Sequence, residues 1–313
     1  MAHEIENMFY VGETPWHGLG VPLNAPPTIE EAIDLAGLNW SVNVEPVYLS
    51  TGEESKKARA VVRDYDKAEL GIVGTSYTPL QNQDAFSWFQ PFVDSGSVEL
   101  HTAGSLRGGE RVWILANVKG GSKEIVKGDE VQSFMLLSNG HDGKLSARVG
   151  FTPIRVVCAN TMSMAHGSES SKLIRVKHTS QVKENLLDIR ETMDTINRSF
   201  EMTYEQLRHL ASRGCNENDL KKFVQVVFKT KHDIEDEESS SKVYDEVVEL
   251  FIAGKGSDIK GVRGTWWGAY NAVTEHLSWT RGDNKDTRIN NLWFQSGSRI
   301  NKIALDTALQ LAA

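Results

Sequence analysis

The chain has 313 residues, 40% of them hydrophobic, so it is long enough to bury one large core or two ordinary ones. It has two cysteines outside any CxxC spacing, no apolar run near the roughly 18 residues of a membrane span, and no signal-peptide pattern at its start. These features exclude a disulfide-stapled secreted domain and a membrane-spanning protein, and they predict a soluble, cytoplasmic protein.

The first 155 residues carry mainly strand patterns. A capping-box spacing between Thr28 and Glu31 predicts a short helix that ends at Gly37. Alternating apolar residues, bounded by Gly, Asp or Asn turns, then predict three hairpins, with a short helix between the first two. The predicted hairpin strands cover residues 58–65 and 68–73, 98–105 and 111–118, and 131–138 and 144–151, and the short helix covers 82–93.

Helical periodicity dominates after residue 180. Apolar residues recur every three or four positions from 181 to 212, and further helices are predicted over 220–228, 243–251, 266–279 and 300–311. Strands that precede helices, rather than alternate with them, favour an α+β fold, with an N-terminal antiparallel β-meander and a few helices, then a C-terminal helical region. We predict a β-rich core domain over residues 1–180 and a mainly helical region over 181–313 packed on it.

Motifs for metal, nucleophile and phosphate-loop chemistry do not occur in the sequence. The histidines have no HExxH spacing, there is no GxSxG elbow, and the Gly254-Lys255 pair lacks the upstream glycine of a P-loop. We therefore predict no metal, no cofactor and no catalytic residue. An unrecognised enzyme remains an alternative, and its polar groups would come from positions near strand ends: Asn139, His141, Asp142 and Asn160.

Positive charge is concentrated in one segment of an acidic chain. Residues 1–150 hold 12 Lys and Arg against 20 Asp and Glu, so the net charge of −8 belongs to this half, while residues 151–313 hold 22 of each. Residues 144–183 hold seven Lys and Arg against Glu169 alone. Such a segment predicts an anion-binding face. The alternative is that these charges neutralise the acidic half within a monomer or an oligomer.

Single-stranded DNA is the ligand that this segment favours. Phe151 lies between Arg148 and Arg155, and a basic groove with a stacking aromatic ring binds single strands without sequence preference. Lysines would neutralise the phosphate backbone. The predicted nucleic-acid-binding residues are Lys144, Arg148, Phe151, Arg155, Lys172, Arg175 and Lys177.

Six motifs give the chain a family resemblance. They are GETPWHGLG at residues 12–20, YTPLQN at 77–82, AGSLRGG at 103–109, LSNGHDG at 137–143, VGFTPIRVVCANT at 149–161 and WGAYNAVTE at 267–275. Together they resemble the phage/plasmid-like proteins of unknown function found on laterally transferred elements, and the resemblance spans nearly the whole chain. It implies a mobile-element context and no catalytic residues.

A second resemblance concerns topology. The predicted helix that ends at Gly37, followed by Trp40 and a strand meander, is similar to the core of single-strand annealing recombinases of phages. That resemblance implies a homo-oligomer with a basic groove for single-stranded DNA, and it rests on topology rather than on matched motifs.

Three hypotheses follow from these observations. The leading one is a mobile-element DNA-metabolism protein that binds single-stranded DNA and promotes annealing and recombination. The second is a counter-defence or regulatory protein that binds a host protein or a nucleotide signal. The third is the enzyme built around the polar residues near the strand ends.

Overall fold

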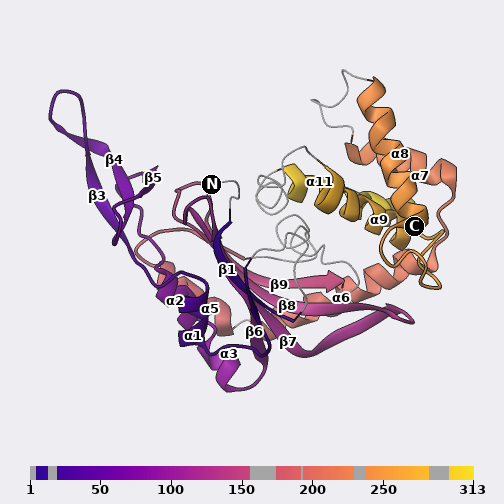
Figure 1. Cartoon of the computed structure of the whole chain (residues 1–313), viewed down its shortest axis with the longest axis horizontal. Coiled ribbons are helices and arrows are strands. Elements are labelled where there is room, and N and C mark those ends of the chain that lie inside the picture. The colour runs from indigo at the N-terminus through magenta and orange to yellow at the C-terminus, as the bar shows by residue number, and fades with distance from the viewer. Residues whose placement is uncertain (1–4, 13–19, 156–173, 192, 229–236, 282–295) are drawn as a thin grey trace. The chain divides into compact units, whose positions relative to one another are not determined.

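The computed structural model describes residues 5–12, 20–155, 174–191, 193–228, 237–281 and 296–313 (Figure 1). Strands gather in the first half of the chain and helices in the second, so the predicted α+β class is confirmed. The strands are β1 Ile5–Val11, β2 Val21–Leu23, β3 Val42–Tyr48, β4 Glu54–Arg63, β5 Glu69–Val73, β6 Val98–Leu106, β7 Arg111–Val126, β8 Asp129–Gly140, β9 Ala147–Arg155 and β10 Ile174–Val176.

The helices follow the predicted order, but three predicted segments each cover two helical elements, and the segment 181–212 covers Val182–Glu191 and Met193–Ser212. The pattern over 82–93 forms two short helices, because Pro91 lies in the first turn of the second helix and lacks the N–H that a continuous helix would need. The pattern over 266–279 forms an α-helix followed by one π-helical turn. The helices are α1 Ile29–Leu35, α2 Asn82–Ser87, α3 Gln90–Asp94, α5 Val182–Glu191, α6 Met193–Ser212, α7 Glu217–Phe228, α8 Glu237–Ala253, α9 Trp266–Glu275, η2 His276–Thr280 and α11 Ser296–Leu311.

The strands form two sheets. The larger sheet has the order β10-β9-β8-β7-β6-β1-β2, so the predicted meander from β6 to β9 lies in consecutive positions. Strand β1 pairs with β2 in parallel, whereas the pairs β1–β6, β6–β7 and β9–β10 are antiparallel. The smaller sheet is the antiparallel set β3-β4-β5. The three predicted hairpins are therefore confirmed.

The β6–β7 hairpin depends on a left-handed turn. Arg107, Gly108 and Gly109 have φ angles of 56°, 64° and 93°. A Cβ atom on Gly109 would lie 3.0 Å from Cζ2 of Trp40, so this position needs glycine both for its backbone angle and for the close approach of the indole. Glycine at position 109 is therefore required both by the hairpin turn and by the packing of Trp40 against it.

Backbone contacts divide the chain into two compact units, each described here by itself. Unit 1 comprises Met1–Gly120, Phe134–Gly150 and Leu173–Thr195, and unit 2 comprises Gly121–Ser133, Phe151–Lys172 and Ile196–Ala313. Each unit therefore combines segments that are distant in sequence. The sequence-based boundary near residue 180 stays a prediction.

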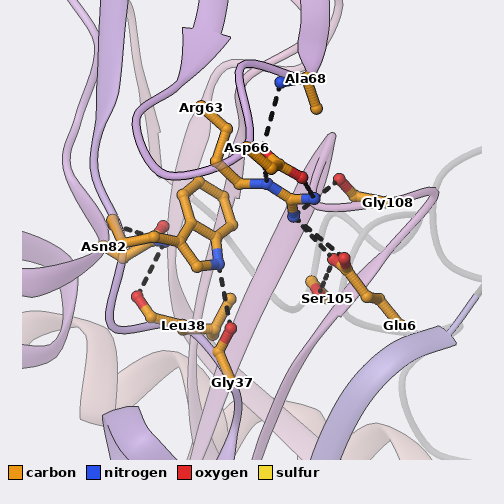
Figure 2. A network of polar contacts seen from close by, with 10 residues as sticks. Glu6, Gly37, Leu38, Arg63, Asp66, Ala68, Asn82, Ser105 and Gly108 are labelled. Carbon is orange, nitrogen blue, oxygen red and sulfur yellow. Dashed lines mark hydrogen bonds and ion pairs between the residues drawn. The ribbon is translucent and has the colours of Figure 1, made fainter.

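The core of unit 1 includes a buried arginine, Arg63, at the end of β4. Its guanidinium donates to the carboxylates of Asp66 (2.6 and 3.0 Å) and Glu6 (3.0 and 3.1 Å), and to the Gly108 carbonyl (Figure 2). It also lies 5.3 Å from the centroid of the Trp40 ring. A buried charge is tolerated only when it is paired and hydrogen-bonded, and Arg63 meets this requirement. Because its partners come from different segments, the network joins β4, β1 and the β6–β7 turn.

The core of unit 2 is helical and includes the tip of the β7–β8 hairpin. The hydroxyl of Tyr204 on α6 lies 2.7 Å from the carbonyl oxygens of both Gly121 and Val131. Trp267 on α9 is buried, and its indole N–H donates to Asp129 on β8. Helix α6 and helix α9 are thus each tied to the hairpin by a buried hydrogen bond.

The capping box of α1 provides a test of the local sequence reading. The Thr28 hydroxyl accepts a bond from the Glu31 amide at 3.2 Å, and the Glu31 carboxylate accepts one from the Thr28 amide at 2.9 Å. We expect Thr28→Ala to lower the free energy of unfolding by about 1 kcal/mol, because an orphan amide loses its partner. Urea unfolding measures this loss. Thr28→Ser keeps the cap, so its free energy of unfolding should lie within roughly a few tenths of a kcal/mol of that of the natural chain. Equal losses in both variants would contradict the capping role.

Candidate anion-binding site

Three of the four residues predicted for a polar site come together in unit 1, at the end of β8. Asn139, His141 and Asp142 are buried, whereas Asn160 lies outside the described residues. The Asn139 amide donates to the Leu80 carbonyl at 2.9 Å, and Nε2 of His141 lies 3.1 Å from Oδ1 of Asn82. Two of the motifs behind the family resemblance, at residues 77–82 and 137–143, therefore meet here.

His141 is a neutral imidazole in this cluster. Its side chain is fully buried, and burial, with nearby His178 as a smaller cause, lowers its pKa to about 3. Its ring lies 5.3 Å from that of Trp40. Among the described residues its Nδ1 has no hydrogen-bond partner. A neutral, inaccessible imidazole positions its neighbours and does not carry positive charge near pH 7.

Asp142 closes the β8–β9 turn and pairs with Arg111 at the start of β7. The carboxylate lies 3.2 Å from Arg111 Nη2, and both side chains are buried. Its other oxygen accepts bonds from the amides of Lys144 (2.9 Å) and Leu145 (3.3 Å). A Cβ on Gly71 would lie 2.6 Å from the Asp142 Cα, so the two backbones are in close contact. Because both of its oxygens are engaged in these contacts, the Asp142 carboxylate has a structural role.

Two arginines face each other at the edge of the larger sheet. Arg148 of β9 and Arg175 of β10 are direct partners in the antiparallel register, which places both side chains on the same face with Cβ atoms roughly 5 Å apart. Arg175 is exposed and Arg148 half-buried. Among the described residues neither arginine forms an ion pair, and Nε of Arg148 has no hydrogen-bond partner.

The environment of Arg148 is strongly positive. Burial lowers the pKa of Arg148 to about 10, and the positive charges of Arg175 and Arg111 add to this effect. Arg148 still carries its charge near neutral pH. Like charges placed directly opposite each other on a sheet are destabilising, and in the described part of the chain no carboxylate compensates this pair, as a structural role would normally require.

The predicted lysines of this segment lie near the arginine pair in sequence. Lys144 is exposed in the turn before β9, and Lys177 is exposed directly after β10. Lys172 lies outside the described residues. Four of the seven predicted nucleic-acid-binding residues thus belong to unit 1 with exposed or half-buried side chains: Lys144, Arg148, Arg175 and Lys177.

Phe151 and Arg155 do not present the open side chains that the predicted nucleic-acid-binding face requires, because both side chains are buried. Phe151 is 6% exposed, so its ring offers no face to a base. Arg155 donates to both oxygens of Asp129, at 2.7 and 2.8 Å, and to the carbonyls of Lys255 and Gly256. Both residues belong to unit 2, where Arg155 fills a structural role that its sequence neighbours do not reveal.

Other aromatic rings are open where Phe151 is not. Tyr48 of β3 and Tyr65 of the β4–β5 turn are 63% and 65% exposed. The rings of Tyr77 and His178 stack with centroids 4.9 Å apart and are half-buried. Sequence reasoning missed Tyr77, Asn82 and His178 because nothing in their own segments indicates the partners they meet. The only signal was that 77–82 is itself one of the family-like motifs.

Metal and thiol chemistry find no built site in the part of the chain that the structure describes. No cluster of three or more His, Cys, Asp or Glu side chains there could hold a metal ion. Cys215 is buried, and burial raises the pKa of its thiol to about 12. None of the helices that the structure describes is long and apolar enough to cross a membrane.

Comparison with known proteins gives one match. A family model described as a domain of unknown function, DUF932, matches residues 69–302, which include the Arg148–Arg175 pair and the cluster around His141. No curated protein and no solved structure matches the chain.

Proposed function

This chain belongs to the DUF932 family, and we propose that it is a phage- or plasmid-borne protein of DNA metabolism that binds single-stranded DNA and promotes annealing. The observation that carries the proposal is the cross-strand pair of Arg148 and Arg175. Two guanidinium groups with no carboxylate partner among the described residues, in a chain of net charge −8, favour a ligand that brings its own negative charge.

Phosphate is the group that fits these side chains best. A guanidinium binds phosphate oxygens through a planar fork of N–H donors, and the exposed lysines Lys144 and Lys177 add charge on either side of the pair in sequence. Phosphate contacts position a strand without reading its sequence. Annealing needs bases that stay free to pair, so binding through the backbone suits that activity.

The enzyme alternative gains less support from the same region. Asn139, His141 and Asp142 are all buried, and both oxygens of Asp142 are engaged. A substrate would therefore have no open path to these three side chains. The alternative of a protein that blocks a host partner becomes the leading one if the chain binds no DNA.

Fluorescence anisotropy with labelled single- and double-stranded oligonucleotides tests the proposal. We expect salt-sensitive binding with a preference for single strands, and a loss of about tenfold or more in the Arg148→Ala/Arg175→Ala variant. The slope of log affinity against log salt should fall by about 0.7 for each lost contact. Mixing complementary strands should then show faster annealing with the natural chain than with the variant.

The matched control is Lys221→Ala/Lys222→Ala, which removes the same charge from exposed positions on α7 of unit 2. This control should change the affinity for the oligonucleotides by less than about twofold, because salt screens the long-range attraction between charges. Absence of binding at low salt, or equal losses in both double variants, would overturn the proposal.

A further inference from the structure

We infer that the Arg148–Arg175 pair binds a terminal phosphate of a nucleic acid strand, a phosphomonoester, more tightly than an internal phosphodiester. This inference rests on the proposed function and deepens it. It concerns the same two side chains, but it names the chemical group that they recognise.

The first argument is the number of donors directed to one place. Arg148 and Arg175 are opposite partners on neighbouring strands, so their guanidinium groups lie on one face of the sheet. Each group can hold two oxygens through its fork of N–H donors, and Nε of Arg148 is one donor with no partner in the described part of the chain. Two forks suit a group with three free oxygens. A phosphomonoester has three, whereas an internal phosphodiester has two.

The second argument is charge. Among the described residues, the charged groups that face Arg148 are Arg175 from β10 and Arg111 from β7, and Asp142 from the β8–β9 turn pairs with Arg111. His178, which follows β10, is half-buried and His141 is buried, and burial lowers the pKa of both. Among the described residues, Arg111 is therefore paired with a carboxylate, whereas Arg148 and Arg175 have no carboxylate partner and leave an excess of positive charge. A monoester carries close to two negative charges at pH 7 and neutralises this excess better than a diester, which carries one.

The third argument is position. Arg148 is half-buried and Arg175 is exposed on β10, the edge strand of the larger sheet in the described part of the chain. A terminal phosphate is linked to the rest of the nucleic acid by one ester bond only. It can therefore approach the half-buried Arg148 more closely than an internal phosphate, which is linked to nucleotides on both sides.

The charge argument also predicts a pH dependence of definite sign. The second pKa of a phosphomonoester is about 6, so its affinity should fall between pH 7 and pH 5 as the dianion is protonated. Protonation of His178 or His141 would add positive charge and raise affinity as the pH falls. The direction of the change therefore separates titration of the ligand from titration of the protein.

The experiment compares short single strands of one sequence, each labelled internally, with a 5′-phosphate, with a 3′-phosphate, or with hydroxyl groups at both ends. We expect the natural chain to bind at least one phosphorylated strand about tenfold more tightly than the hydroxyl strand. The two phosphorylated strands show which end is recognised. Inorganic phosphate should compete with the phosphorylated strand more effectively than with the hydroxyl strand.

The decisive variant is Arg148→Lys, which keeps the charge and removes the fork. It should keep affinity for the hydroxyl strand and lose most of the preference for a terminal phosphate. Its melting temperature, compared with that of the natural chain, checks that it is folded. Equal, salt-sensitive binding of all three strands would overturn the inference and leave the proposed function standing, whereas no binding of any strand would overturn both.

Discussion

Replacing Asp129 with alanine is expected to lower the free energy of unfolding by about 3–5 kcal/mol, because it leaves Arg155 charged and buried without its counterion. Asp129 is fully buried and accepts bonds from Arg155 Nε at 2.7 Å, Arg155 Nη2 at 2.8 Å and the Trp267 indole at 2.8 Å. All three hydrogen bonds to the Asp129 carboxylate would be lost together. Urea unfolding of the purified chain, followed by tryptophan fluorescence, measures the change.

Two further variants separate this buried pair from ordinary ion pairs. Asp306→Ala breaks the exposed Lys302–Asp306 pair of α11 and should cost at most about 1 kcal/mol. The double variant Asp129→Leu/Arg155→Met removes both charges and should be less destabilised than Asp129→Ala alone, because no uncompensated charge remains. If Asp129→Ala proves as mild as Asp306→Ala, the buried pair does not stabilise unit 2 as described.

Acidification below pH 6.5 is expected to destabilise the chain through His141. The sign follows from the pKa values: burial lowers the pKa of His141 from 6.5 to about 3, so the unfolded chain binds a proton that the folded chain excludes. The contribution of the neutral, buried His141 to the free energy of unfolding is therefore fully present above pH 6.5, and it decreases as the pH falls towards 3. Over that window His141 alone contributes a slope of about 1.4 kcal/mol per pH unit.

The measurement is the free energy of unfolding at pH 7 and pH 5 in the natural chain and in His141→Gln. The variant should be less stable at pH 7, since it loses the contact with Asn82, but it should lose less stability on acidification. Burial also lowers the pKa of His101 and His178, so part of the slope should remain. His209→Gln, on α6 of unit 2, is the control. A slope unchanged in His141→Gln would contradict a neutral, buried imidazole.

Local patterns in the sequence predicted much of the fold. The capping box at Thr28 involves residues three apart, and each hairpin depends on a turn and on alternation within about ten residues. Composition also located the basic segment that includes Lys144, Arg175 and Lys177. These features need no knowledge of distant parts of the chain, because backbone geometry and turn chemistry act over a few residues.

The roles of individual side chains were decided by tertiary structure. Arg148 and Arg155 look alike in sequence, yet one faces Arg175 across two strands and the other is buried against Asp129, 26 residues away. His141 meets Asn82 across 59 residues. Burial and pairing depend on strand register and on which elements pack together, and a shift of one residue moves a side chain to the opposite face of a sheet. For that reason composition could locate the positive charge of this chain, but only the pairing of β9 with β10 could place two guanidinium groups side by side.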